Sequence, residues 1–340
     1  MSQRRLRTAV VGIGAVGQEM LKVLRQRSFP VSDLKVLARR PRDVTVDGEI
    51  CQVQQISAEA FEGIELALFA GAETPEGHLG WEAVKRGAVV IDNSSAFRMH
   101  PNVPLVVPEV NSHALEKHEG LVSNPNCSTI QMVVALKPLH DIARIKRICV
   151  STYQAVSGKG ADAVQQLEKE VEAIGRGEPM PEPGGGFRHP IAGNVLPYDN
   201  VSWPMAADGY TSEEVKMIRE TRKILEDDTI QITATCVRVP VRTAHGEAVN
   251  VEFHEPISAE DARAILSSAP GIVVEDDPQK EICPLPFDVE GTDEVYVGRI
   301  RQDRSVPYGL NMWVVADNLR KGAALNAVQI AETMMQRGLL

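Results

Sequence analysis

Continuous apolar runs of strand length alternate with segments of helical spacing over the first third of the chain. The runs predict buried strands at residues 6–11, 34–38, 65–70 and 89–92, and residues 104–108 and 121–123 are expected to complete the sheet. Between them, apolar residues recur three and four apart from Val16 to about Arg27 and again around residues 81–85, as one face of a helix requires. Strands that alternate with helices favour a parallel sheet, so we expect an α/β fold that begins with a Rossmann-like N-terminal domain.

Beyond the first third, long β-branched runs become frequent and the helices between them scarce. The expected strands lie at residues 145–153, 229–239, 247–254, 294–301 and 309–316. This composition is typical of a mainly antiparallel sheet, so a second domain of the α+β type is expected. Thr211-Ser212-Glu213-Glu214 has the pattern of a capped helix start, and a long C-terminal helix is predicted from Asn318 to Met335.

The composition is that of a globular protein, and 340 residues suit two domains better than one core. A net charge of −10 argues against a nucleic-acid partner, because binding a phosphate backbone needs a basic face. The five cysteines are widely spaced and form no CxxC motif, so neither a disulfide framework nor a metal site is expected. No segment reads as a signal peptide or a membrane span, and a cytoplasmic protein without a membrane partner is the expectation.

A GxGxxG motif stands between the first strand and the first helix. It comprises Gly12, Ile13, Gly14, Ala15, Val16 and Gly17. Glycines let a pyrophosphate approach the backbone and the helix N-terminus supplies a complementary field, so the motif predicts a dinucleotide site; a tight turn without a ligand is the alternative. Arg39 and Arg40 follow the second strand, where arginine suits the 2′-phosphate of NADP, although a solvated basic loop is also common.

A single cysteine, Cys127, follows the polar, kinked segment Ser123-Asn124-Pro125-Asn126 and precedes an apolar run of helical spacing. Strand, tight turn and helix together place its sulfur at a helix N-terminus, where the dipole and the unpaired N–H groups favour a thiolate. A buried cysteine that acts as a small apolar residue is the alternative. Because so polar a turn makes a poor core strand, we expect a reactive thiol.

Charged side chains elsewhere are candidates for substrate binding and proton transfer. Arg98 follows an Asn-Ser-Ser turn at the end of a predicted parallel strand, where open sheets place ligands. Arg238 offers a bidentate fork for a carboxylate, and His245 suits acid–base chemistry near neutral pH. Glu213 and Lys216 share a helix face. Each has a structural alternative when taken singly, such as a surface arginine or a surface ion pair.

Several unusual segments occur together and in order along the chain. They are NSSAFR (93–98), SNPNCST (123–129), YQAVSGKG (153–160), EEVK (213–216), CVRVPV with the following AHGE (236–247) and DNLRKGAALNAVQIAE (317–332). Through them the whole chain strongly resembles the aspartate-β-semialdehyde dehydrogenase family. The resemblance implies reduction of L-aspartyl-4-phosphate by NADPH to L-aspartate-4-semialdehyde, with release of phosphate. It also implies a place in lysine (through diaminopimelate), threonine and methionine biosynthesis.

The resemblance further implies roles for individual residues. Cys127 would attack the acyl phosphate and form a thioester, and His245 would handle the proton. Gln154 would orient the substrate near the thiol. Asn126, together with the Cys127 N–H, is a candidate oxyanion donor.

Binding positions follow from the same resemblance. The α-carboxylate of the substrate would meet Arg238, and its ammonium group would meet Glu213. The phosphate would be bound by Lys216 and Arg98. The positions that match the nicotinamide end of NADP(H) are Ser157, Gly158 and Asn318.

The family pattern also implies an architecture and a partner. Residues 1–127 would form the NADP-binding Rossmann-like domain, residues 128–316 the catalytic and dimerisation domain, and residues 317–340 a helix that packs back on the first domain. A homodimer is expected through the catalytic domain. The chain departs from the pattern in two places: its glycine loop is one residue shorter, and Arg39-Arg40-Pro41-Arg42 replaces the usual Ser-x-Arg.

Two rival interpretations remain. Another acyl-phosphate reductase of the same layout, such as N-acetyl-γ-glutamyl-phosphate reductase, would also use a thiol, a histidine and NADPH. The Glu213/Lys216 pair and Arg238 favour a substrate with a free amine and a free carboxylate, and hence aspartyl phosphate. A non-catalytic relative of the same fold would be expected to lack the thiol or the base, and both are present.

Overall fold

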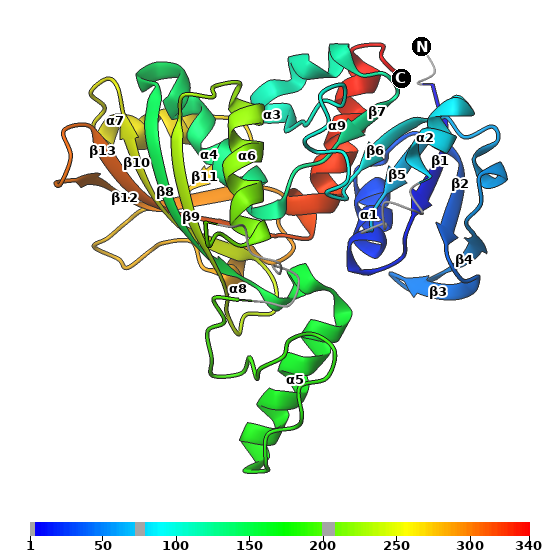
Figure 1. Ribbon diagram of the computed structural model, residues 1–340, viewed down its shortest axis with the longest axis horizontal. Coiled ribbons are helices and arrows are strands. Elements are labelled where there is room, and N and C mark those ends of the chain that lie inside the picture. Colours follow the sequence, from blue (N-terminus) through cyan, green and yellow to red (C-terminus); the bar gives the residue numbers. More distant parts are fainter. Residues whose placement is uncertain (1–3, 72–78, 199–207) are drawn as a thin grey trace. The chain divides into compact units, whose positions relative to one another are not determined.

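The computed structural model describes residues 4–71, 79–198 and 208–340 (Figure 1). The chain forms two compact units, and each is described by itself. The first comprises residues 1–126 together with 323–340, and the second comprises residues 127–322. In the part of the chain that is described, no helix combines the length and the apolar character needed to cross a membrane.

A seven-stranded sheet forms the centre of the first unit, in the order β3-β4-β2-β1-β5-β6-β7. Its strands are β1 (Leu6–Val11), β2 (Val31–Ala38), β3 (Arg42–Val46), β4 (Glu49–Gln55), β5 (Leu66–Phe69), β6 (Val89–Asp92) and β7 (Leu121–Ser123). All neighbours pair in parallel except β3 and β4. Since β2 and β5 flank β1 on opposite sides, the strand order reverses at the carboxyl end of β1, where doubly wound sheets bind ligands.

The antiparallel pair β3–β4 differs from the sequence-based interpretation, which predicts no strand between residues 38 and 65. Both strands are largely exposed, and within them only Val46 and Val53 are buried. One buried apolar residue per strand gives almost no alternating signal, so the pattern alone could not reveal this edge of the sheet. The segment 104–108, expected to extend the sheet, contributes only an isolated bridge from Leu105 to Ser123. Pro108 instead begins a short helix, a position that suits its fixed φ.

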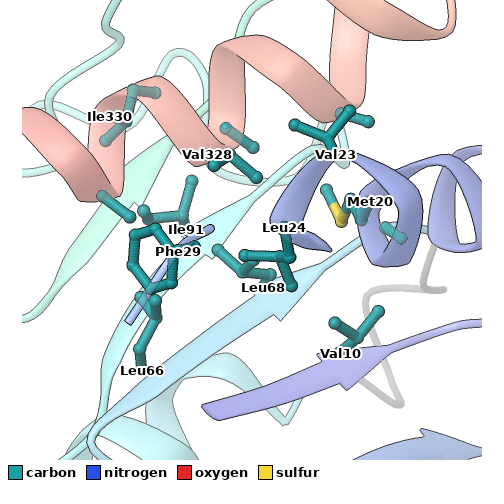
Figure 2. Close-up of a cluster of buried hydrophobic side chains, with 14 of the residues drawn as sticks. Val10, Met20, Val23, Leu24, Phe29, Leu66, Leu68, Ile91, Val328 and Ile330 are labelled. Carbon is teal, nitrogen blue, oxygen red and sulfur yellow. The ribbon is translucent and has the colours of Figure 1, made fainter. Parts of the chain in front are cut away.

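Helices cover the sheet of the first unit and share its core. They are α1 (Ala15–Gln26), α2 (Gly80–Lys85), α3 (Pro108–Asn111), α9 (Leu325–Gln336) and the 3₁₀ segments η1 (Glu59–Phe61) and η3 (Ser112–Lys117). Figure 2 shows Met20 and Leu24 of α1, Leu68 of β5 and Val328 of α9 in one cluster of buried side chains. The C-terminal helix therefore belongs to the core of the first unit, although more than half of the chain separates it from β7.

The second unit is built on a six-stranded sheet in the order β11-β12-β13-β10-β8-β9. Its strands are β8 (Ile145–Gln154), β9 (Gln231–Arg238), β10 (His245–Phe253), β11 (Ile272–Val274), β12 (Val295–Asp303) and β13 (Gly309–Ala316). Three of the five pairings are antiparallel, and the pairs at the two edges, β11–β12 and β8–β9, are parallel. The sheet is therefore mixed but mainly antiparallel.

The helices of the second unit include one that is buried on nearly all sides. They are α4 (Cys127–Ala143), α5 (Ala161–Arg176), α6 (Ser212–Leu225), α7 (Ala259–Ser268), α8 (Pro286–Val289), the 3₁₀ turn η4 (Val156–Lys159) and the π-helical turn η5 (Arg320–Ala324), which crosses the unit boundary. α4 contacts strands β8, β10, β12 and β13 as well as α6 and α7. A helix that is packed between a sheet and other helices is buried on all its faces, and every residue of α4 from Ser128 to Leu136 is buried.

Two boundaries differ from the division expected from the sequence. Cys127 is the first residue of α4 and so begins the second unit, whereas the sequence placed it at the end of the first. Residues 317–322 also belong to the second unit, because Asn318 bonds to Ser157 and to the Ala244 N–H there. The regular C-terminal helix consequently begins at Leu325 and not at Asn318.

Candidate active site

Cys127 opens α4 at the carboxyl side of the Asn-Pro-Asn turn and is half-buried. The first-turn N–H groups of a helix have no intrahelical acceptor, and their field stabilises a thiolate. Gly322, in the π-helical turn η5, lies directly against it: a Cβ at this position would sit 2.9 Å from Cys127 Cβ. Sequence reasoning did not single out Gly322, and the close approach explains why a glycine stands there.

Gln154, at the end of β8, joins three elements around the thiol. Its amide nitrogen donates to Ser128 Oγ on α4 at 2.8 Å and approaches Glu213 Oε1 on α6 at 3.3 Å. Glu213 in turn accepts from Lys216 Nζ at 3.1 Å. The Glu213–Lys216 pair is therefore linked to the helix that carries Cys127, which the alternative of a plain surface ion pair does not predict.

Arg238 ends β9 directly opposite Gln154 of β8 and is buried. Its Nη1 donates to the Ala155 carbonyl at 2.8 Å, which fixes the guanidinium over the start of η4. Burial of an arginine is costly unless its charge meets hydrogen bonds or an anion. A buried guanidinium beside Gln154 is thus well suited to hold a carboxylate.

His245, the first residue of β10, is fully buried, and its imidazole has a defined tautomer. The Ala155 N–H donates to Nδ1 at 3.0 Å, so the neutral ring carries its proton on Nε2. Nε2 is buried and bonds to none of the described residues. Burial, with a smaller contribution from the Arg238 charge, lowers the pKa of His245 to about 3, against an opposing influence of Glu213. Without a ligand the imidazole is therefore neutral, with an N–H to donate.

The backbone before His245 is held in an uncommon conformation. Ala244 is buried with a φ of 69°, a region that L residues seldom adopt. The Asn318 side chain accepts from the Ala244 N–H at 2.9 Å and also donates to Ser157 Oγ at 3.0 Å. Asn318 thus ties the turn before His245 to η4 and stabilises the strained residue.

Gly158 leaves a space between two of these groups. A Cβ on Gly158 would lie 2.9 Å from Arg238 Nη1 and 3.3 Å from His245 Nε2. The absence of a side chain there lets an atom of a ligand approach both the guanidinium and the imidazole. The residues expected near the nicotinamide, Ser157 and Gly158, are therefore next to the acid–base and carboxylate-binding candidates.

The first unit carries the glycine motif in a conformation that suits a pyrophosphate. Gly12 has a φ of +92°, and a Cβ on Gly17 would fall 2.0 Å from the Gly12 carbonyl oxygen, so only glycine fits either position. A Cβ on Gly14 would meet nothing within 4 Å, which leaves open space at the start of α1. Among the described residues no side chain caps α1, so its first N–H groups are available to an anion. The residues fit a dinucleotide.

The remaining predicted residues also lie in the first unit. Arg39 and Arg40 are exposed immediately after β2. Arg98 is buried after β6, where its Nη2 donates to the Asn93 carbonyl at 2.7 Å. Asn126 is buried just before Cys127. The structure gathers the other predicted residues within the second unit: Gln154, Ser157, Gly158, Glu213, Lys216, Arg238, His245 and Asn318.

Comparison with known proteins gives the class first. Residues 7–118 match the family model described as "Semialdehyde dehydrogenase, NAD binding domain". Residues 136–321 match "Semialdehyde dehydrogenase, dimerisation domain". Fold, nicotinamide-cofactor domain and thiol-bearing second unit together define a two-domain semialdehyde dehydrogenase.

Individual relatives identify the family within this class of two-domain dehydrogenases. An aspartate-semialdehyde dehydrogenase of Aquifex aeolicus is 50% identical over 98% of this chain and 99% of its own length. One of Bacillus subtilis is 46% identical over 99% of both. A crystal structure of aspartate semialdehyde dehydrogenase II from Vibrio cholerae, complexed with ASA, is 41% identical, has a TM-score of 0.92, and is matched over 98% of this chain and 99% of that one. The chain belongs to the aspartate-semialdehyde dehydrogenase family and is an oxidoreductase. The resemblance, fold class and enzyme class expected from the sequence are thus confirmed.

Proposed function

We propose that the chain reduces L-aspartyl-4-phosphate to L-aspartate-4-semialdehyde through a thioester on Cys127, with NADPH as the reductant. The observation that carries this proposal is the position of Cys127 at the N-terminus of α4, in the unit that also holds Gln154, Arg238 and His245. The names of the relatives support the substrate. The arrangement accounts for each step in turn.

Formation of the thioester needs a thiolate and a positioned carbonyl. The field at the start of α4 favours the thiolate of Cys127, which attacks the acyl carbon while phosphate leaves with the electrons of the broken C–O bond. Gln154 lies between Ser128 and Glu213 and orients the acyl group by its amide. The Cys127 N–H and Asn126 are the proposed donors to the oxyanion.

A nicotinamide cofactor, when bound, would supply the hydride that reduces the thioester carbonyl. The resulting alkoxide requires a proton donor, and His245 offers the Nε2–H that its tautomer fixes. When the thiohemiacetal collapses, Nε2 takes that proton back, the C–S bond breaks, and Cys127 leaves as a thiolate. On this account His245 first acts as an acid toward oxygen, and the helix terminus stabilises the sulfur anion.

Substrate recognition is assigned to charged residues at the positions that the family pattern implies. Arg238 binds the α-carboxylate with its fork, and Glu213 binds the ammonium group. Because Lys216 already pairs with Glu213, binding of a zwitterion with a phosphate would give each member of the pair its own partner. Arg98 is the second phosphate-binding residue in this proposal.

Cofactor binding is assigned to the first unit. The glycine motif and the N-terminus of α1 would hold the pyrophosphate, and Arg39 with Arg40 would hold the 2′-phosphate that distinguishes NADP from NAD. Ser157, Gly158 and Asn318 would lie near the nicotinamide. The domain description of the second unit supports a homodimer, which sedimentation should show; a monomer at assay concentration would contradict it.

The proposed reaction is tested in reverse with purified protein. We expect reduction of NADP in the presence of L-aspartate-4-semialdehyde, with an absolute need for phosphate, because phosphate must attack the thioester. Cys127→Ala should lose this activity by several orders of magnitude while it remains folded. A second series with NAD measures what Arg39 and Arg40 contribute. A folded wild type without phosphate-dependent activity would refute the proposal, and the other acyl-phosphate substrate would then be assayed. The lysine, threonine and methionine pathways are the proposed destinations of the product.

A further inference from the structure

A short segment of the second unit runs from the strand partner of His245 to the residue that contacts Cys127. Ala316, the last residue of β13, lies directly opposite His245 where β13 pairs with β10. Gly322, at the other end of the segment, is the glycine that lies against Cys127. Residues 317–322 therefore connect the proposed acid–base residue to the proposed nucleophile over a very short length of chain.

Asp317 fixes the first turn of this segment through three acceptor oxygens. Its Oδ1 accepts from the N–H groups of Leu319 and Arg320 at 2.8 and 3.1 Å, and its Oδ2 accepts from the Gly291 N–H at 2.8 Å. Its backbone carbonyl accepts from the Gly322 N–H at 3.0 Å. A bond of this span closes a π-helical turn, which is rare in proteins and frequently occurs at functional sites. The bond sets where Gly322 lies relative to the end of β13.

Arg320 anchors the middle of the segment. Its side chain is buried, and its Nε and Nη2 both donate to Asp293 Oδ1, at 2.9 and 2.6 Å. Hydrogen bonds between charged groups are stronger than neutral ones, and low exposure to water strengthens them further. Asp293 lies just before β12, a strand of the sheet that also contains β10. The ion pair therefore ties the π-helical turn to the sheet that carries His245.

Gly322 lies between two residues of the candidate site. A Cβ on it would be 2.9 Å from Cys127 Cβ, 3.3 Å from Cys127 Cα and 3.6 Å from Asn318 Cβ. These atoms belong to or adjoin the backbone, so they cannot turn aside as the end of a flexible side chain can. Asn318 in turn accepts from the Ala244 N–H, next to His245. The glycine thus meets the residue that bears the thiol on one side and the residue that holds the turn before the imidazole on the other.

We propose that residues 317–322 are a positioning segment, which fixes Cys127 relative to His245. Arg320 holds the π-helical turn in place, and Gly322 transmits its position to the start of α4 by direct contact. The segment acts through these two residues and not through a bond to the substrate. The inference rests on the roles of the thiol and the imidazole proposed above, and it adds residues that the proposed reaction does not itself require.

Gly322→Ala tests the contact with Cys127. Gly322 does not have a positive φ, so alanine can adopt its backbone conformation and the added Cβ is the only change. Relief of the overlap needs a shift of about 0.5 Å before carbon–carbon contact becomes normal. We expect kcat to fall roughly tenfold with KM within about twofold, because the shift misplaces the nucleophile. Gly175→Ala in α5, where a Cβ would meet nothing within 4 Å, is the control.

A second readout does not depend on turnover. Iodoacetamide should alkylate Cys127 severalfold more slowly in folded Gly322→Ala than in the wild type, since the new methyl group covers one side of the residue and shifts it at the helix terminus. Mass spectrometry of the labelled peptide distinguishes Cys127 from the other four cysteines. Loss of global stability alone would not slow alkylation of the folded protein.

Variants of the anchor test the ion pair. Asp293→Ala should lower kcat and slow the alkylation of Cys127, each roughly threefold to tenfold, as loss of bonds to a charged group does. Asp293→Asn keeps an oxygen that can accept from Arg320 and should restore most of both rates. Asp276→Ala is the matched control: it removes a buried carboxylate that accepts from Arg263 Nε at 2.6 Å on α7, and it should lower stability but keep both rates.

Contrary results are distinct. Wild-type kcat and alkylation in folded Gly322→Ala would overturn the positioning role. Equal losses in Asp293→Ala and Asp276→Ala, or no recovery in Asp293→Asn, would also overturn it, and the Asp293 variants decide if Gly322→Ala does not fold. A folded wild type without dehydrogenase activity would refute the proposed reaction, while the alkylation rates would still show whether the segment positions the thiol.

Discussion

At His245 a single backbone N–H decides which nitrogen can do chemistry. The Ala155 N–H occupies Nδ1, and the ring must therefore present Nε2–H toward the space beside Gly158. The residue type was evident from the sequence, but the tautomer depends on Ala155, which lies 90 residues earlier in the chain. Arg238, which shares that space, is likewise fixed through the Ala155 carbonyl. One short segment after β8 thus sets both side chains.

Gly158→Ala should fill the space beside Arg238 and His245 with a methyl group. The added Cβ would lie 2.9 Å from Arg238 Nη1, which cannot retreat without loss of its bond to Ala155. We expect kcat/KM for the semialdehyde to fall by roughly tenfold to a hundredfold, as for other misplacements of about 1 Å. Gly175→Ala in α5, where a Cβ would meet nothing within 4 Å, is the control and should leave kinetics unchanged. Normal kinetics in Gly158→Ala would exclude this space from the site.

At the scale of the element, the N-terminal cap of helix α6 fixes the position of the site residues on its first turn. Thr211 accepts from the Glu214 N–H at 3.3 Å, and Glu214 Oε2 accepts from the Thr211 N–H at 2.7 Å, which completes a capping box. The other carboxylate oxygen of Glu214 accepts from the Cys236 N–H at 3.0 Å, two residues before Arg238. The cap therefore fixes the first turn, with Glu213 and Lys216, to the strand that carries the arginine.

Two cap variants separate helix stability from site geometry. Thr211→Ala and Ser258→Ala each remove an N-cap and should each cost about 1 kcal/mol of unfolding free energy. Only Thr211→Ala should also raise KM severalfold, because α7, which Ser258 caps, carries none of the site residues. Urea unfolding and steady-state kinetics measure the two effects. Equal KM values in the two variants would show that the α6 cap does not position the pair.

For the molecule as a whole, the C-terminal helix α9 completes the hydrophobic core of the first unit. α9 packs on α1, α3 and β6, so the first unit cannot complete its core until the chain has passed through the second. The cluster in Figure 2 joins Ile330 and Val328 to Phe29, Leu66 and Ile91. Folding of the cofactor domain is therefore coupled to residues that lie at the end of the chain.

Ile330→Ala should consequently weaken the first unit. Its side chain is fully buried, and truncation should cost about 2–5 kcal/mol of unfolding free energy. We expect calorimetry to show a lower transition temperature and titration to show weaker binding of the nicotinamide cofactor as that temperature is approached. Alkylation of Cys127, in the second unit, should keep its wild-type rate at lower temperature. Gln336→Ala, exposed at the end of α9, is the control and should stay within about 0.5 kcal/mol. Unchanged stability in Ile330→Ala would contradict the shared core.

The amino-acid sequence by itself determined what short-range patterns encode. Continuous apolar runs located the parallel strands, and a capping pattern located the helix start at Thr211. Helical spacing located the helix that begins near Cys127, because burial of one helix face repeats about every 3.6 residues. The unusual segments indicated the aspartate-semialdehyde dehydrogenase family. That resemblance in turn implied which residues should lie around Cys127.

Only the tertiary structure decided which groups meet. The contact of Gly322 with Cys127, the Nδ1 bond of His245 and the bond from Gln131 to the His245 carbonyl join residues that are distant in the chain. The β3–β4 hairpin was also not predicted from the sequence. Most of its side chains are exposed, so its apolar residues show no regular alternation. A sequence pattern reports how much of a side chain is buried, whereas the partner that satisfies a buried polar atom is set by how the chain closes on itself.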